Sequence, residues 1–220
     1  MKLIRPWLQR PFEQAFSPLV GGLISQGVHP NTLTTIGFFV VAASATAFGL
    51  GFVRTGSFFL LLSGVFDVLD GKVARGTGNM TRFGAFYDST LDRVGDAAVL
   101  GGIGLFFMMG GVVPSLEVWG VAAAMVALSS SLIVSYTRAR AEGLNLDCKV
   151  GIVQRAERIV GIGVPCLFFG AGSSGLLLFV IVSVLAVLSA LTVVQRIYHV
   201  YRVTRSEPDV EGSEASGRVR

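Results

Sequence analysis

The stretch FDVLDGKVARGTGNMTRFGAFYDSTLDRVGD, residues 66–96, concentrates negative charge in an otherwise apolar chain. Its aspartates are Asp67, Asp70, Asp88, Asp92 and Asp96. Within each of two groups they are spaced by three or four residues, so on helices each group lines one face. Between the groups, GTGNMTR at 76–82 predicts a short turn that makes the two helices antiparallel. We therefore predict that both carboxylate faces converge near one end of a helical pair.

Around this stretch the composition is that of a membrane protein. Of 220 residues, 52% are hydrophobic, 15% are charged and 28 are glycine, which is not the balance of a soluble domain. The longest uncharged runs are 14–53, 97–116, 118–137 and 159–195. Each is long enough for at least one span of about 20 residues, and the first and last are longer still. GAGSSG at 170–175 divides the last run into a hairpin.

These runs predict an all-α integral membrane protein with six transmembrane helices in one membrane domain, 1–204. The predicted spans lie near 32–53, 56–76, 84–109, 112–142, 154–170 and 175–204. Residues 1–25 are expected to form an interfacial amphipathic helix, because apolar residues recur there every four positions. The tail 205–220 is polar and is expected to be disordered on the cytoplasmic side.

The distribution of basic residues predicts the orientation. With both termini in the cytoplasm, Arg54 is the only one of 18 Lys and Arg residues on the outer side, as the positive-inside rule favours. The expected location is the cell membrane, with the aspartates at its cytoplasmic surface. The net charge of +4 requires only anionic membrane lipids as partners, so nucleic acid is not indicated. Cys148 and Cys166 lack the spacing of a metal site or a disulfide framework.

Carboxylates gathered in this way need positive charge beside them, because an ionised residue inside hydrocarbon costs at least a few kcal/mol. Arg75, Arg82 and Arg93 offer one solution, in which the acids only hold helices together. A carboxylate-rich site without a nearby histidine also suits Mg²⁺ or Mn²⁺ better than zinc. Two such ions are a usual means of neutralising a phosphate or pyrophosphate during displacement. Gly71 and Gly84 would let a ligand or backbone approach these helices closely.

The fixed positions D-x2-D-G-x2-A-R-x8-G-x3-D-x3-D, from Asp67 to Asp92, resemble the signature of the CDP-alcohol phosphatidyltransferase family. The upstream HPNTLT at 29–34 also resembles the segment that enters the first span in that family. The resemblance implies transfer of a phosphatidyl group from CDP-diacylglycerol to an alcohol, with release of CMP. Because members are commonly homodimers, it also implies a homodimer.

The resemblance also implies roles for individual residues. The ligands of two Mg²⁺ or Mn²⁺ ions would be Asp67, Asp70, Asp88 and Asp92. Asp92 would in addition be the general base that takes the acceptor's proton. Contacts to CDP-diacylglycerol would come from Asn31, Thr34, Gly71, Ala74, Arg75, Thr81 and Gly84. Asp96 lies outside the pattern and is expected to support the site as a salt-bridge partner of Arg93.

The acceptor alcohol is indicated by arginines in the second half of the chain. The predicted cytoplasmic helix ends carry Arg138, Arg140, Arg155, Arg158 and Arg196. Guanidinium groups match phosphate oxygens, so a phosphorylated acceptor is expected. The segments ARAE, RAER and VQR resemble the branch of the family that actinobacteria use to make phosphatidylinositol phosphate from inositol 1-phosphate. That branch implies that Arg138, Arg158 and Arg196 bind the acceptor phosphate.

Other functions remain open at this point. Glycerol 3-phosphate, which would make the protein a phosphatidylglycerophosphate synthase, is the main alternative acceptor. Unphosphorylated inositol or serine is disfavoured by the arginines. The arginines could also merely satisfy the positive-inside rule. A divalent-cation transporter is the alternative from another class, but the outer halves of the predicted spans are almost wholly apolar.

Overall fold

The computed structural model of the chain describes residues 18–205 and is helical throughout. After a helical segment at 18–25, the main helices are α2 (Pro30–Gly49), α3 (Val53–Thr77), α4 (Arg82–Met108), α5 (Glu117–Glu142), α6 (Arg155–Phe169) and α7 (Leu176–Arg205). Short 3₁₀ turns, Pro114–Leu116 and Ser173–Gly175, precede α5 and α7. Most of the predicted interfacial helix 1–25 and nearly all of the tail 205–220 lie outside the described residues.

The helix boundaries differ from the predicted spans at the first turn, and α5 begins at Glu117 rather than at residue 112. The first helix was expected to continue to residue 53, but α2 ends at Gly49 and α3 already begins at Val53. Gly51 adopts φ of +84°, a conformation that a glycine reaches without steric cost and that closes this tight turn. Arg54 therefore lies in the first turn of α3, where its guanidinium donates to the carbonyl of Phe168 at 3.4 Å.

Within residues 18–205, three of the helical segments are long and apolar enough to cross a membrane. They are Pro30–Gly49, Pro114–Glu142 and Ser173–Arg205. α3 and α4 are long enough but carry the charged stretch. α6 has 15 residues, about 22 Å at 1.5 Å per residue, which is shorter than a bilayer core of about 30 Å. Over the described residues, the structure thus confirms an all-α fold with three helices that are long and apolar enough to span a membrane.

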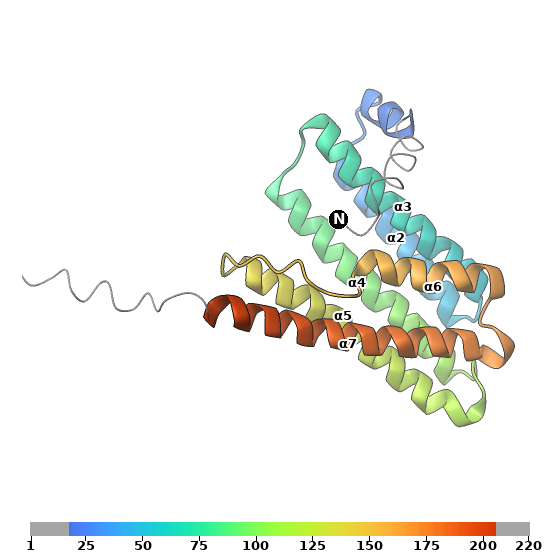
Figure 1. Cartoon of the computed structure of the whole chain (residues 1–220). Helices are drawn as coiled ribbons and strands as arrows, with labels where there is room; N and C mark the ends of the chain where they lie inside the picture. Colours follow the sequence, from blue (N-terminus) through green and yellow to red (C-terminus); the bar gives the residue numbers. More distant parts are fainter. Residues whose placement is uncertain (1–17, 206–220) are drawn as a thin grey trace, which may run out of the picture.

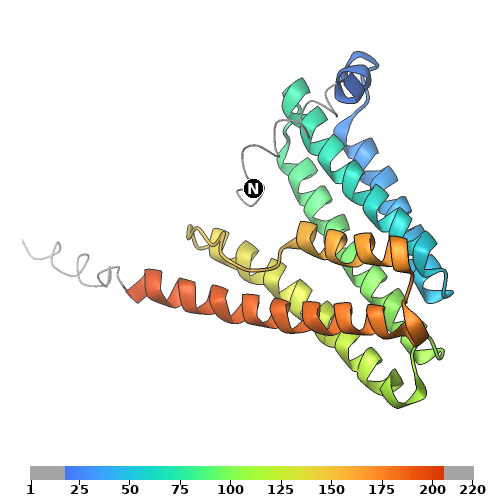
Figure 2. The same cartoon turned by 45° about the vertical axis from the view of Figure 1, so that its right-hand side comes forward.

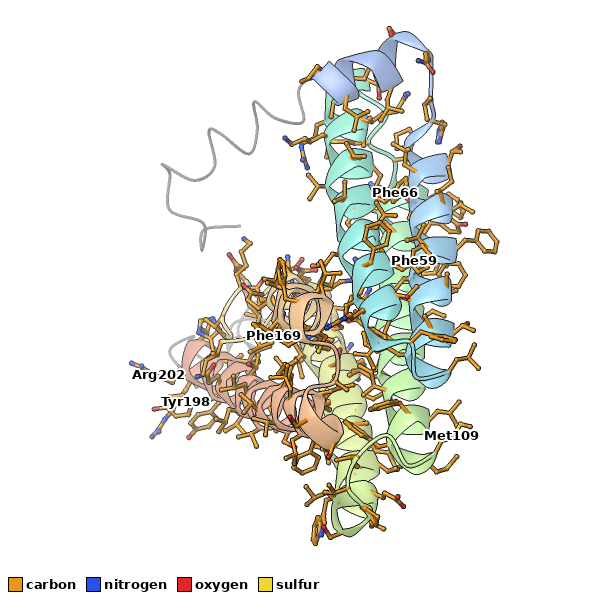
Figure 3. All side chains as sticks on the ribbon, turned by 90° about the vertical axis from the view of Figure 1, so that its right-hand side faces the viewer. Phe59, Phe66, Met109, Phe169, Tyr198 and Arg202 are labelled. Carbon is orange, nitrogen blue, oxygen red and sulfur yellow. The ribbon has the colours of Figure 1, made fainter. Side chains whose placement is uncertain are left out.

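The helices form two arms that diverge from one end (Figures 1 and 2). α2 packs on α3 and α4, while α5 packs on α4 and α7, and α6 packs on α3 and α7. α4 therefore belongs to both arms. Figure 3 shows Phe59 and Phe66 on α3 in one arm, and Tyr198 and Arg202 near the end of α7 in the other. The arms separate towards the helix ends on the aspartate side.

Close backbone contacts tighten the packing elsewhere. A Cβ on Gly102 of α4 would lie 2.2 Å from the carbonyl oxygen of Ala45 on α2, so only glycine permits this approach. Beyond the end of α4, a Cβ on Gly175 would lie 2.0 Å from the carbonyl oxygen of Gly111. The loop after α4 and the turn before α7 are thus in direct contact where the arms converge.

Two apolar clusters stabilise this arrangement. The larger one runs through the helices and includes the fully buried side chains of Phe48, Ile103, Phe107, Leu178 and Val182. The smaller one consists of Leu33, Leu69 and Val73 with partly buried residues of the segment 18–28. Burial of apolar area in this second cluster fixes the helical segment 18–25 against α2 and α3.

Candidate functional site

The aspartates of α3 and α4 converge on a residue of α6. Nη1 of Arg155, the first residue of α6, donates to Asp67 and forms an ion pair with Asp92. Nε of Arg155 lies 3.5 Å from Oδ1 of Asp96. The predicted convergence of the two carboxylate faces is therefore observed, and a cation lies between them. The positive partner comes from a helix that follows α4 by almost fifty residues.

Asp70 is held from the opposite side by α2. The hydroxyl of Thr34 donates to Oδ2 of Asp70 at 2.8 Å, and both residues are buried. A hydrogen bond of this kind fixes the orientation of a carboxylate that has little access to water. Thr34, which was predicted to contact the nucleotide lipid, orients an aspartate in this structure.

Asp96 pairs with a different arginine from the one expected. Its Oδ2 accepts a hydrogen bond from Nη2 of Arg158 on α6 and another from Ser131 on α5, at 3.3 Å. Arg93, the expected partner, instead donates to the carbonyl of Ser89 one turn back along α4. The prediction for Arg93 was wrong because its side chain turns back along its own helix, whereas Arg158 comes from the helix that faces Asp96.

Arg155 and Arg158 also link two helices that lack direct backbone packing. α6 packs on α3 and α7, and α4 packs on α2 and α5, but α4 and α6 do not pack on each other. Among the described residues, the recorded ion pairs of Asp67, Asp92 and Asp96 all involve these two arginines. None of these ion pairs involves Arg75, Arg82 or Arg93. The alternative in which those three arginines neutralise the aspartates is therefore not observed.

A cavity of about 400 Å³ lies beside this network. It is bounded by α4, α5, α6 and α7. Its charged lining residues are Asp88, Asp92, Arg93, Asp96, Arg138, Glu142, Arg155, Arg158 and Arg196. Acidic side chains come mainly from α4 and basic ones from the helices that follow. Such a cavity can hold a ligand whose anionic group faces the arginines while its reacting group faces the aspartates.

The three predicted phosphate-binding arginines all line this cavity but differ in their bonds. Arg158 is 5% exposed, and its buried Nη1 has no hydrogen-bond partner. Nε of Arg138 donates to Glu142 at 2.9 Å in an exposed pair. Arg196 is buried and donates to the backbone carbonyls of Val150, at 2.9 Å, and Val134. Arg158 is thus the arginine whose donor most needs a partner.

Arg196 has an additional structural function that the sequence did not reveal. The loop 143–154 passes over α7, where Arg196 binds Val150 and the hydroxyl of Thr192 accepts from the amide of Val153 at 3.3 Å. These bonds fix the loop that leads into Gln154, the cap of α6. Arg196 therefore positions the start of α6 as well as lining the cavity.

The residues predicted to contact the nucleotide lipid lie at the starts of α2 and α4 and in the last turns of α3. Thr81 caps α4 by accepting from the amide of Gly84 at 2.9 Å. A Cβ on Gly84 would lie 3.2 Å from Oδ1 of Asn31, so this glycine lets α2 and α4 approach. The guanidinium of Arg75 lies over Gly71, with Nη1 3.5 Å from the position of an added Cβ. Ala74, next to Arg75, is half-buried on α3.

The aspartates suit a hard divalent cation in their chemistry. Within residues 18–205 no group of three or more His, Cys, Asp or Glu side chains is arranged to hold a metal ion, and Arg155 lies among the aspartates. Carboxylate oxygens from two helices are nevertheless the donors that Mg²⁺ and Mn²⁺ prefer. Nη1 of Arg155 already contacts both Asp67 and Asp92, so carboxylates of two helices share one positive group. The donor set therefore fits a cation, provided that Arg155 yields its place.

Arg155 is the residue of this site that sequence reasoning left without a role. It was recognised only as one of five arginines at helix ends. Its distinguishing signal is weak: it directly follows Gln154, which caps α6 together with Glu157, so the side chain of Arg155 projects from the first turn. Placement of that turn opposite the aspartates depends on the tertiary fold.

Comparison with known proteins supports the sequence-based resemblance. Residues 27–194 match the family model described as CDP-alcohol phosphatidyltransferase. An archaetidylinositol phosphate synthase of Methanothermobacter thermautotrophicus is 44% identical over 58% of this chain and 60% of that protein's length. A phosphatidylinositol phosphate synthase of Streptomyces avermitilis is 39% identical over 75% of this chain and 67% of that protein.

Solved structures show the same fold. A crystal structure of Mycobacterium tuberculosis phosphatidylinositol phosphate synthase with CDP-DAG bound has a TM-score of 0.74 and 33% identity, over 86% of this chain and 94% of that chain. A second crystal structure of that protein, in complex with manganese and citrate, has a TM-score of 0.73 and 34% identity, over 84% of this chain and 88% of that one.

Proposed function

We propose that this chain, which belongs to the CDP-alcohol phosphatidyltransferase family, transfers the phosphatidyl group of CDP-diacylglycerol to inositol 1-phosphate and releases CMP. The observation that carries this proposal is a cavity whose lining combines aspartates of α4 with arginines of α5, α6 and α7. Carboxylates suit cation-assisted displacement at phosphorus, and arginines suit an acceptor that is itself phosphorylated. The names of the relatives from Streptomyces and Mycobacterium support the choice of acceptor.

The nucleotide end of the lipid lies along the start of α4 and the last turns of α3. The residues proposed to contact it are Asn31, Thr34, Gly71, Ala74, Arg75, Thr81 and Gly84. Gly71 leaves the face under the Arg75 guanidinium free of a side chain, so a phosphate oxygen can reach that donor. A site at the membrane surface lets the acyl chains remain in the bilayer while the nucleotide stays in water.

The proposed cation ligands are Asp67, Asp70, Asp88 and Asp92, which would hold two Mg²⁺ or Mn²⁺ ions. When bound, the ions supply positive charge that stabilises the pyrophosphate and the departing CMP. The Mycobacterium protein in complex with manganese supports a divalent cation in this family. Thr34 keeps Asp70 oriented for this purpose through its hydrogen bond.

The transfer needs one base and one anion site. Asp92 takes the proton from the acceptor hydroxyl as its oxygen forms a bond to the phosphatidyl phosphorus. The bond from that phosphorus to the bridging oxygen of the pyrophosphate breaks, and CMP leaves with this oxygen. Arg138, Arg158 and Arg196 hold the acceptor phosphate so that the hydroxyl faces Asp92. Nη1 of Arg158, which has no other partner, is the donor best placed for this phosphate.

In the membrane, the chain is proposed to span six times in a cell membrane, with both termini and the site on the cytoplasmic side. Three spans coincide with the long apolar helices. Pairing of the buried charges of α3, α4 and α6 with one another makes these helices compatible with a membrane interior. The molecule is proposed to act as a homodimer, as the family resemblance implies.

The proposed function is tested by following CMP release from CDP-diacylglycerol by purified protein with Mg²⁺ or Mn²⁺. Inositol 1-phosphate, inositol, glycerol 3-phosphate and serine are offered separately. Release with inositol 1-phosphate alone is the expected result. Release with glycerol 3-phosphate instead would keep the aspartate chemistry and overturn the acceptor. Failure with all four, together with cation flux into proteoliposomes, would overturn the enzyme and favour transport.

A further inference from the structure

Arg155 holds the position between the aspartates that a cation would take. Its Nη1 contacts Asp67 on α3 and Asp92 on α4, which are two of the proposed cation ligands. The side chain is 21% exposed, so the pair is largely shielded from water. In such surroundings charged groups interact more strongly than they do in bulk solvent. A divalent cation and this guanidinium therefore cannot both use the same carboxylate oxygens.

Arg155 also has an alternative position within reach. It lines the same cavity as Arg138 and Arg158, where the acceptor phosphate is proposed to bind. Its Nε is buried without a hydrogen bond and has only the 3.5 Å ion pair with Oδ1 of Asp96. Arg158, whose buried Nη1 has no hydrogen-bond partner, lines the same cavity. A phosphate there would meet two arginines that each have a nitrogen without a hydrogen bond.

We infer that Arg155 competes with the divalent cation for Asp67 and Asp92, and that cation binding transfers its guanidinium to the anionic acceptor in the adjoining cavity. This inference rests on the proposed function, because it assumes that a cation and a phosphorylated acceptor bind there. It adds a residue that couples the two. Cation binding would free Arg155 from Asp67 and Asp92, and the acceptor phosphate would then bind it.

The coupling has a necessary thermodynamic consequence. If cation binding frees Arg155 for phosphate, phosphate binding must also favour the cation, because coupling between two binding sites is reciprocal. Each ligand shifts the position of Arg155 only by binding one of its positions better than the other. An arginine that simply braces α3 and α4 would instead give no linkage between cation and phosphate.

The experiment measures Mn²⁺ binding to the purified full-length chain in lipid nanodiscs, from the electron paramagnetic resonance signal of free Mn²⁺. Wild type, Arg155→Gln and Arg155→Lys are compared with and without inorganic phosphate. Arg93→Gln is the matched control, because Arg93 lines the same cavity but donates to a backbone carbonyl rather than to an aspartate. Protein-free samples give the correction for Mn²⁺ bound to phosphate itself.

Removal of the competing guanidinium should strengthen Mn²⁺ binding by Arg155→Gln roughly tenfold over wild type, within the usual range of coupling between sites. Arg155→Lys should remain nearer to wild type because it keeps the charge. Arg93→Gln should change affinity by less than about threefold, because a charge without a carboxylate bond is partly screened by water. Phosphate should strengthen Mn²⁺ binding in wild type but not in Arg155→Gln.

Equal Mn²⁺ affinity in wild type and Arg155→Gln, or equal gains in Arg155→Gln and Arg93→Gln, would overturn the inference and leave the proposed function intact. Absence of Mn²⁺ binding by every variant would overturn the proposed cation site together with the inference. Should Arg155→Gln fail to fold, wild type alone still decides: Mn²⁺ affinity that is independent of phosphate would overturn the transfer of Arg155.

Discussion

Asp96 on α4 accepts a hydrogen bond from Arg158 on α6, although these two helices do not pack on each other. The long side chain of Arg158 thus bridges the distance between the backbones of α4 and α6. Arg158 is almost fully buried and lines the cavity, and its other terminal nitrogen has no hydrogen-bond partner. Asp96 therefore fixes the direction in which Arg158 presents its free donor.

Substitution Asp96→Asn should lower both stability and acceptor affinity. Loss of one member of a buried ion pair costs about 3–5 kcal/mol, because the other charge is left uncompensated. We expect a lower melting temperature and a roughly tenfold higher KM for inositol 1-phosphate, with a smaller change in kcat. Asp147→Asn is the control, since Asp147 pairs with Lys149 in an exposed position. Unchanged KM would show that Asp96 does not position Arg158.

Substitution Asp92→Asn should abolish turnover while leaving CDP-diacylglycerol binding partly intact. The proposed base is lost, whereas the other three aspartates keep their carboxylates. General-base removal typically costs a factor of about 10²–10⁴ in rate. CMP release measures the rate, and thermal stabilisation by CDP-diacylglycerol measures binding. Near-normal turnover would remove Asp92 from the mechanism.

Substitution Thr34→Val should raise the concentration of Mn²⁺ that the protein needs for activity. It keeps the side-chain shape but removes the hydrogen bond that orients Asp70. Loss of a group that orients a metal ligand typically costs about 10–100-fold in metal affinity or activity. The concentration of Mn²⁺ that gives half-maximal CMP release measures this change. Thr46→Val on the same helix is the control, because the Thr46 hydroxyl bonds only to the carbonyl of Ala42. Equal behaviour of the two variants would contradict the role of Thr34.

Substitution Arg196→Ala should raise the KM for the acceptor and loosen the loop 143–154. The side chain lines the cavity and also binds the carbonyls of Val150 and Val134. Hydrogen exchange at the amides of residues 150–153 reports the loop, and initial rates report the KM. Arg140→Ala is a control with an exposed arginine at the end of α5. A faster-exchanging loop with an unchanged KM would leave Arg196 a structural role only.

Two neighbouring glycines of α4 test the close packing of α2 and α4. Gly102→Ala should destabilise the protein by about 1–3 kcal/mol, as forced overpacking usually does. The added methyl would meet the carbonyl oxygen of Ala45, whereas nothing lies within 4 Å of one at Gly101. Gly101→Ala should therefore be neutral or stabilising by up to about 1 kcal/mol. Thermal unfolding in one detergent compares them, and equal melting temperatures would contradict the packing.

Much of this arrangement could be predicted from the sequence because the signals are local. The turn at 76–82 separates two aspartate groups that lie close in the chain, so their convergence followed from helix spacing. Apolar runs likewise indicated the number of helices and most of their ends. The boundary near Gly51 was missed, because an uncharged run continues through this turn and only the left-handed glycine interrupts it.

The partners of the aspartates could not be predicted in the same way. Arg155 and Arg158 are far from the signature in sequence, and nothing local distinguishes them from Arg138 or Arg140. Their role depends on where α3 and α7 place α6. Arg93 seemed the natural partner of Asp96 because it is three residues away, but a long side chain can equally bond to its own helix.

The contact between Gly111 and Gly175 lies at the end of the molecule where the two arms converge. With no side chain on either residue, the loop after α4 and the turn before α7 touch backbone to backbone. α7 continues from there for 30 residues, about 45 Å at 1.5 Å per residue. A rotation about this point displaces nearby atoms least and the far end of α7 most. The displacement would therefore be largest on the side where the arms diverge (Figure 2).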